Sequence, residues 1–137
     1  MKNVPLVLVV EDDDDDQFLL QTVVAQSESA CELVFASNGE EALDQLASLK
    51  KKPSFILTDL NMPKLNGLEL LKTLKVHPDW NRIPVIMLTT TTSPDVIAQS
   101  YESGASSYVS KPPSIEGLKQ VWQNLYAFWI LTAQASG

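Results

Sequence analysis

The sequence of 137 residues contains a single cysteine, Cys31, so no disulfide can form within one chain. A metal centre built from several thiolates is excluded for the same reason. Structural disulfides belong to oxidising compartments, and a lone thiol in an apolar stretch usually packs as a small hydrophobic group. We therefore expect Cys31 to be a buried, inert thiol in a protein of the cytoplasm.

The chain also lacks a long apolar run and an excess of basic residues. No apolar stretch approaches the roughly 20 residues that span a bilayer, and Met1 and Lys2 lead into an apolar segment without a signal-peptide pattern. Ten lysines and arginines face 17 aspartates and glutamates, which gives a formal net charge of −7 and a pI of about 4.5. Phosphate backbones need a basic surface, so we expect neither nucleic acid nor membrane as a partner.

The composition and length of the chain are typical of one globular domain. With 45% hydrophobic and 20% charged residues, the chain is long enough to bury an adequate core. We predict a single domain over residues 1–137, with its core at about 4–131 and a short flexible C-terminal tail of small residues.

Strand-like and helix-like segments alternate along the chain. Short apolar, β-branched runs predict strands, and apolar residues at helical spacing predict the helices between them. A capping box is predicted from Ser37 with Glu40. One further helix is predicted to start at Ser93 with Pro94 and another at Ser114, and Gly104 predicts a helix end. The predicted strands are Leu6–Val10, Cys31–Ala36, Phe55–Thr58, Val85–Leu88 and Tyr108–Val109.

This alternation predicts an α/β fold. Five strands and five helices joined by right-handed crossovers form a doubly wound parallel sheet in three α/β/α layers, a flavodoxin-like (βα)5 arrangement. In such sheets the functional site lies at the carboxyl ends of the strands. Polar residues directly after the strands therefore become the candidate site.

A block of six acidic residues, Glu11 to Asp16, follows the first apolar run. Like-charged blocks are usually solvated, and Asp14–Asp16 are explained by the preference of helix N-termini for anions. Glu11 and Asp12 lie at the end of the predicted strand, so the preference of helix N-termini does not explain why they are acidic. Asp59, Thr89 and Lys111 follow other strands, so we expect all five to converge in one cleft.

Three converging carboxylates repel one another unless a cation compensates their charge. Oxygen ligands favour a hard divalent ion, and Mg²⁺ commonly binds one or two carboxylates together with a phosphate oxygen. A lysine and a hydroxyl opposite the carboxylates suit the remaining phosphoryl oxygens. The pattern predicts a Mg²⁺-dependent phosphoryl site in which one carboxylate is the nucleophile.

Four segments in order, "VVEDD", "LTDLNMPKLNG", "MLTT" and "GASSYVSKP", resemble the motifs of bacterial two-component response-regulator receiver domains of the chemotaxis-regulator (CheY-like) fold. The resemblance covers nearly the whole chain. It implies that Asp59 is the phosphoacceptor, that Asp12 binds Mg²⁺ directly and Glu11 through water, and that Asn61 contributes its backbone carbonyl. It further implies that Thr89 and Lys111 bind the phosphoryl group.

The same resemblance assigns a switch and partners. Tyr108 would turn inward when Thr89 moves, and the Lys111–Pro112 bond would be cis. A histidine kinase or a histidine phosphotransfer protein would supply the phosphoryl group, and a phosphorelay of this kind ends in slow autodephosphorylation, not enzymatic turnover. Segments such as "HPDWNRIPVIMLTT" and the final "FWIL" resemble the stand-alone regulators associated with phytochromes. Output would then occur by protein–protein interaction through the helix-four to helix-five face.

Two other functions remain open. A phosphate-independent binding module would be expected to have lost one of the five site residues. A small Mg²⁺-dependent aspartyl-phosphate phosphatase would have a second acid two residues after the nucleophile, where this chain has Asn61. Thr90 is bulkier than the small residue common at that position, which predicts narrower access to an acyl phosphate.

The last predicted helix contains two sets of apolar residues. One set forms a stripe at 3.6-residue spacing, which predicts burial against the sheet: Leu118, Val121, Trp122, Leu125 and Trp129. The other set falls outside this stripe and consists of Tyr126, Phe128, Ile130 and Leu131. They predict either contacts with neighbouring loops or a homodimer surface.

Overall fold

The computed structural model describes residues 4–132. It contains one parallel sheet with the strand order β2-β1-β3-β4-β5, and a helix follows each strand. The fold class predicted from the sequence is confirmed. The strands are β1 (Leu6–Val10), β2 (Glu32–Ala36), β3 (Phe55–Thr58), β4 (Val85–Thr89) and β5 (Ser107–Ser110); the helices are α1 (Asp14–Gln26), α2 (Gly39–Ser48), α3 (Gly67–Lys75), α4 (Pro94–Glu102), α5 (Ile115–Tyr126) and the π-helix η1 (Ala127–Thr132).

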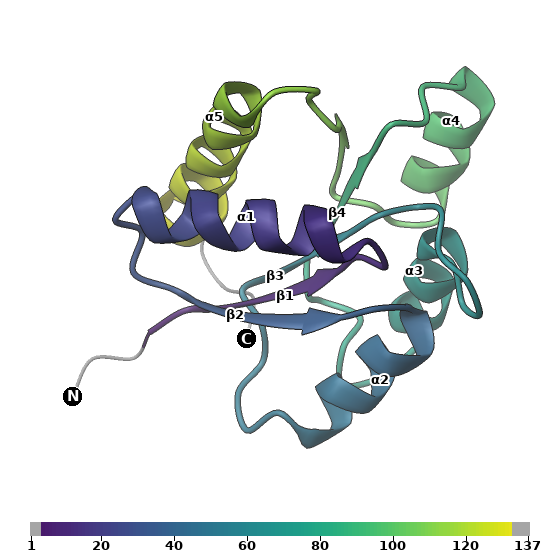
Figure 1. The fold of residues 1–137 in the computed structure, drawn as a ribbon. Helices are drawn as coiled ribbons and strands as arrows, with labels where there is room; N and C mark the ends of the chain where they lie inside the picture. The colour runs from purple at the N-terminus through teal and green to yellow at the C-terminus, as the bar shows by residue number, and fades with distance from the viewer. Residues whose placement is uncertain (1–3, 133–137) are drawn as a thin grey trace.

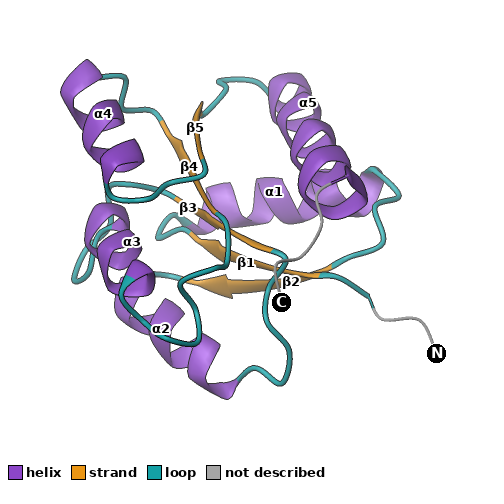
Figure 2. Ribbon diagram, turned by 180° about the vertical axis from the view of Figure 1, so that it is seen from behind, coloured by secondary structure: helices purple, strands orange, loops and turns teal. Residues whose placement is uncertain are grey.

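The helices form a layer on each face of the sheet. Helices α1 and α5 cover one face, whereas α2, α3 and α4 lie on the other (Figures 1 and 2). The three central strands β1, β3 and β4 are buried throughout, as their apolar sequences predict, and the edge strands β2 and β5 are more exposed. Strand β2 begins at Glu32, one residue later than predicted, and Cys31 is only partly buried.

One predicted helix cap was wrong. The N-cap of α2 is Asn38, whose side chain accepts a hydrogen bond from the Glu41 backbone N–H at 2.9 Å. Glu41, not Glu40, returns a bond by accepting from the Ser37 backbone N–H at 3.2 Å. The capping pair is therefore shifted by one residue, because Asn38 already supplies the acceptor that the helix start requires.

The remaining cap predictions have mixed outcomes. Ser114 caps α5 by accepting from the Gly117 N–H, and Gly104 follows α4 with a φ of 108°. Ser93 occupies the N-cap of α4 and Pro94 its first turn, but the Ser93 side chain makes no capping hydrogen bond. At that end the backbone geometry and the proline define the start of the helix.

The predicted cis bond between Lys111 and Pro112 was also wrong, since every peptide bond within residues 4–132 is trans. The trans form is the lower-energy isomer of most X–Pro bonds. The Lys111 backbone N–H donates to the Thr89 carbonyl at 2.8 Å, which continues the β4–β5 pairing and directs the lysine side chain toward the site without a cis bond.

The predicted stripe faces the core to different depths: Trp122 and Leu125 on α5 are buried, whereas Leu118, Val121 and Trp129 pack against the same core partly buried. Trp122 is fully buried, stacks at a tilt on Phe55 with ring centroids 6.2 Å apart, and donates its indole N–H to Ser29 Oγ at 3.1 Å. Of the four residues outside the stripe, Tyr126 and Ile130 pack partly against the same core. Phe128 and Leu131 remain exposed.

The change from α5 into the π-helix η1 explains why Ile130 packs against the core. A π turn contains more residues than an α turn, so it rotates the following side chains away from the positions that 3.6-residue spacing predicts. Within residues 4–132, every helix is too short or too polar to span a bilayer. The predicted flexible tail lies outside the described residues, apart from Thr132.

Trp122 supplies a test of the packing. We expect Trp122→Ala to lower the free energy of unfolding by about 3–5 kcal/mol, because it removes a fully buried ring and its hydrogen bond. The matched variant Phe128→Ala removes a half-exposed ring from η1, which directly continues α5. It should lower the free energy of unfolding by roughly 1 kcal/mol. Urea unfolding measures both losses, and equal losses would contradict the packing described here.

Candidate functional site

The register of the sheet brings the ends of β1 and β3 together. Val10 pairs with Thr58, so the next residues, Glu11 and Asp59, leave neighbouring strands at the same edge. The Asp59 backbone N–H donates to the Val10 carbonyl at 3.0 Å, and the Glu11 N–H donates to the Ala36 carbonyl at 2.9 Å. These ladder bonds fix both backbones where the strands end.

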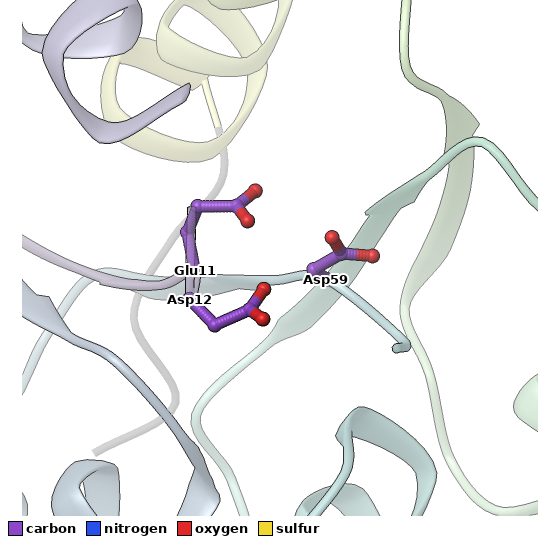
Figure 3. A group of neighbouring side chains, drawn as sticks. All are labelled: Glu11, Asp12 and Asp59. Carbon is purple, nitrogen blue, oxygen red and sulfur yellow. The ribbon is translucent and has the colours of Figure 1, made fainter. Parts of the chain in front are cut away.

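Three carboxylates gather at this edge. One oxygen each of Glu11, Asp12 and Asp59 lies within 4.8 Å of the others. Figure 3 shows Glu11 and Asp12 on consecutive residues, with Asp59 beside them on a neighbouring segment. Three hard oxygen donors at this spacing fit a divalent cation, and their mutual repulsion favours one. The predicted acidic residues of the site are thus brought together.

The backbone of Asp59 is held by a close contact with α3. A Cβ atom on Gly67, the first residue of α3, would lie only 2.2 Å from the Asp59 carbonyl oxygen. The Gly67 N–H also donates to the Leu60 carbonyl at 2.9 Å. A glycine is therefore required where α3 begins, and this close packing fixes the loop that presents Asp59.

Lys111 reaches the same carboxylates from the end of β5. Its ammonium nitrogen lies 2.7 Å from Glu11 Oε1, 3.0 Å from Asp16 Oδ2 and 3.2 Å from Asp59 Oδ2. The lysine side chain is only 16% exposed, so these ion pairs are largely removed from water. Lys111 therefore compensates part of the negative charge of the site.

Burial and charge alter the acidity of these groups in opposite directions. Burial raises the pKa of Glu11, although hydrogen bonds from Lys111 and from the Asp13 backbone N–H oppose the increase. Burial acts to lower the pKa of Lys111, but hydrogen bonds to Glu11 and Asp16 and the nearby negative charges outweigh it and raise the pKa well above its ordinary value. Lys111 therefore stays charged at every physiological pH.

Thr89 is the last residue of β4, and Tyr108 lies within the neighbouring strand β5. Thr89 is fully buried, and its hydroxyl accepts from the Thr91 backbone N–H at 3.4 Å. The Tyr108 hydroxyl donates to the Thr91 carbonyl at 2.6 Å, and the Tyr108 backbone N–H donates to the Tyr101 hydroxyl at 3.0 Å. Burial, then the charge of Asp59, raises the pKa of Tyr108. The loop after β4 is thus bonded to both residues.

Asn61 takes a different position from the other predicted residues. Its backbone N–H lies 3.4 Å from Asp59 Oδ1, and its side-chain amide donates to the Thr91 hydroxyl at 3.1 Å. Asn61 therefore joins the loop after β3 to the loop after β4. Its predicted role as a carbonyl ligand stays a prediction.

Sequence reasoning missed two participants. Asp16 was assigned to the helix start alone, yet it contacts Lys111; the signal was its place in the first turn of α1, five residues after Glu11. The sequence pattern does not single out Thr91, yet this residue contacts Asn61, Tyr108 and Thr89. Only the three-dimensional path of the loop distinguishes Thr91 from its neighbouring threonines.

Comparison with known proteins gives concordant results. The sequence model of the response regulator receiver domain matches residues 7–123. Response regulator Rcp1 of Synechocystis sp. is 35% identical over 131 residues, which cover 92% of this chain and 89% of that protein. The probable methanogenesis regulatory protein FilR2 of Methanothrix harundinacea is 30% identical over 129 residues, covering 91% of this chain and 83% of that protein.

Solved structures agree with the sequence matches. The phosphorylated cyanobacterial phytochrome response regulator RcpA superimposes with a TM-score of 0.91 at 32% identity, covering 98% of this chain and all of that chain (100%). The Mn²⁺-bound form of Rcp1 has a TM-score of 0.86 at 33% identity, with 97% of this chain and 99% of that chain covered. Together with the match over residues 7–123, these similarities establish that the chain belongs to the response regulator receiver domain family.

Proposed function

We propose that this receiver takes a phosphoryl group onto Asp59 from a histidine kinase or a histidine phosphotransfer protein and signals through the change that follows. The observation that carries the proposal is the surroundings of Asp59: two further carboxylates within 4.8 Å and the Lys111 ammonium at 3.2 Å. A nucleophilic carboxylate needs both charge compensation for the incoming phosphoryl group and a fixed position.

The transfer step follows from these positions. An Asp59 carboxylate oxygen attacks phosphorus, the new O–P bond forms, and the bond from phosphorus to the donor's histidine nitrogen breaks, leaving its electron pair on that nitrogen. The Lys111 ammonium and the Thr89 hydroxyl then bind phosphoryl oxygens. The donor histidine belongs to another protein; the sole histidine here, His77, stacks on Trp80 in a loop with ring centroids 3.8 Å apart.

We assign Mg²⁺ as the metal. Asp12 and Asp59 would bind it directly, Glu11 through water, and Asn61 through its carbonyl. When bound, the ion would neutralise the acidic cluster and the developing charge on the phosphoryl oxygens. The donor set of carboxylate oxygens supports this choice over softer metals, and the Mn²⁺-bound form of Rcp1 holds a divalent ion in a similar chain.

The conformational response would run through the loop after β4. Thr89 and Tyr108 are both bonded to Thr91, by way of its N–H and its carbonyl respectively. When the Thr89 hydroxyl turns to the phosphoryl group it leaves the Thr91 N–H, and the loop that holds the Tyr108 hydroxyl can move. The equilibrium between two loop positions would change the helix-four to helix-five face offered to partners.

The rival functions fit less well. A turnover phosphatase of the aspartyl-phosphate type lacks its second acid here, because Asn61 stands two residues after Asp59 and bonds to Thr91. A phosphate-independent binding module would not need Glu11, Asp12, Asp59, Thr89 and Lys111 together. We therefore favour a signalling phosphoacceptor of the cytoplasm that acts by protein–protein contact, with neither nucleic acid nor membrane as its partner.

The relatives support a narrower partner. RcpA is described as a cyanobacterial phytochrome response regulator and is similar over 98% of this chain, so we propose that the donor is a phytochrome-type sensor kinase. We also propose homodimerisation through the helix-four to helix-five face. Phe128 and Leu131 are 52% and 69% exposed at the end of this region, and Tyr101 on α4 is 49% exposed. Apolar side chains left in water favour self-association.

Phosphorylation is tested by intact-mass spectrometry after incubation with acetyl phosphate and Mg²⁺. We expect one phosphoryl adduct on the wild-type chain, none on Asp59→Asn, and none in EDTA. If no adduct forms, binding of fluoroberyllate with Mg²⁺ separates a short-lived acyl phosphate from a phosphate-independent module. Absence of both the adduct and the fluoroberyllate complex would refute the proposed function.

The metal site is tested by thermal unfolding with and without Mg²⁺. A metal at about 100 times its dissociation constant should stabilise the folded chain by about 2.7 kcal/mol. We expect Asp12→Asn to abolish this stabilisation, whereas Asp14→Asn, which removes the same charge outside the cluster, should retain it. An Asp12→Asn variant that keeps the full Mg²⁺ response would show that the ion binds elsewhere.

The dimer is tested by sedimentation of the fluoroberyllate complex at high protein concentration. We expect a dimer for the wild-type chain and a monomer for Leu131→Glu. Val76→Glu is the matched control, because Val76 is 83% exposed at the end of α3, away from the proposed surface. A wild-type monomer with and without fluoroberyllate would exclude the homodimer.

A further inference from the structure

We propose that Asp16 is a positioning residue for the phosphoryl transfer: it holds Lys111 in the unphosphorylated protein and releases it to the phosphoryl group. This inference rests on the proposed function of Asp59. Asp16 lies outside the carboxylate cluster of Glu11, Asp12 and Asp59, yet its Oδ2 is 3.0 Å from the Lys111 ammonium nitrogen. It would act through the lysine and not on the phosphoryl group itself.

The position of Asp16 is fixed by the start of α1. Asp13 caps the helix, and its Oδ1 accepts from the backbone N–H groups of Asp15 at 2.8 Å and Asp16 at 3.1 Å. The Gln17 side-chain amide donates to the Glu11 carbonyl, which ties the same turn to the end of β1. The Asp16 carboxylate is therefore presented to Lys111 by a constrained backbone.

All the hydrogen-bonding capacity of Lys111 is used in this arrangement. An ammonium group has three N–H donors, and Lys111 bonds to Glu11, Asp16 and Asp59. No donor remains for a phosphoryl oxygen. Lys111 must therefore give up at least one carboxylate before it can bind the phosphoryl group.

Exposure indicates which carboxylate is released. The Asp16 side chain is 38% exposed, compared with 9% for Glu11 and 13% for Asp59. A carboxylate that loses a partner inside the protein keeps the full cost of its desolvation, whereas an exposed one regains water. The bond to Asp16 is thus the one that Lys111 can break at least cost.

The surroundings also give Lys111 room to exchange partners. Lys111 and the three carboxylates that it contacts border a cavity of about 90 Å³ between α1 and the loop after β5. Apolar side chains, including Leu20, form most of the rest of its wall. The lysine head group can therefore move within this cavity while the core stays packed.

The test compares Asp16→Asn with Asp15→Asn. Asp15 is the neighbouring exposed carboxylate and is not among the three that Lys111 contacts, so both variants remove one charge from the same helical turn. We expect Asp16→Asn to accelerate phosphorylation by acetyl phosphate and to tighten fluoroberyllate binding by about threefold to tenfold relative to Asp15→Asn. Asp16→Glu, which keeps the carboxylate, should return both values to within about twofold of the wild type.

A double-mutant cycle separates an effect through Lys111 from a general charge effect. In a Lys111→Ala background, Asp16→Asn and Asp15→Asn should bind fluoroberyllate equally well. Nitrogen-15 spectra of the lysine ammonium groups add a readout that does not depend on phosphorylation. In the unphosphorylated protein we expect hydrogen exchange at Lys111 Nζ to become faster in Asp16→Asn and to remain unchanged in Asp15→Asn.

Each result has a defined meaning. If the wild type is phosphorylated but Asp16→Asn behaves like Asp15→Asn, or phosphorylates more slowly, the role of Asp16 is overturned while the function of Asp59 stands. An Asp16→Asn advantage that persists without Lys111 overturns it as well. If the wild type takes neither phosphoryl group nor fluoroberyllate, both proposals fail.

Discussion

The structure of the site depends on one charge balance, in which a single lysine ammonium sits among three carboxylates at the edge of a parallel sheet. Lys111 contacts Glu11, Asp16 and Asp59 within 3.2 Å and is mostly shielded from water. Without this cation the carboxylates would repel one another in a poorly solvated space. The balance remains incomplete, because the acids near Lys111 outnumber it, and this excess of negative charge is what makes the site receptive to a divalent cation.

The fold makes this charge balance possible because it fixes the backbone positions from which the charged side chains extend. Val10 and Thr58 are paired in the centre of the sheet, so Glu11 and Asp59 must emerge side by side. The contact of Gly67 with the Asp59 backbone then prevents the loop after β3 from relaxing away. The buried, close-packed sheet therefore restricts the backbone at the strand ends to one conformation. This restriction in turn fixes the positions of the side chains of the site.

The same edge couples the site to the surface. Thr91 receives bonds from Asn61 and Tyr108 and donates to Thr89, so one loop residue contacts the loop after β3, the last residue of β4 and strand β5. Tyr101 extends the connection to α4 through the Tyr108 backbone. A short series of hydrogen bonds thus connects Asp59 with α4.

By itself the sequence determined the order of strands and helices, the parallel sheet and the convergence of Glu11, Asp12, Asp59 and Lys111, because hydrophobic periodicity and strand ends are local signals with a fixed spatial meaning. Tertiary structure alone decided that Asp16 contacts Lys111, that the bond after Lys111 is trans, and that η1 turns Ile130 toward the core. These features depend on how loops and helix ends meet across the fold. Packing and hydrogen bonding between distant segments select them, so the pattern of neighbouring residues was not enough to predict them.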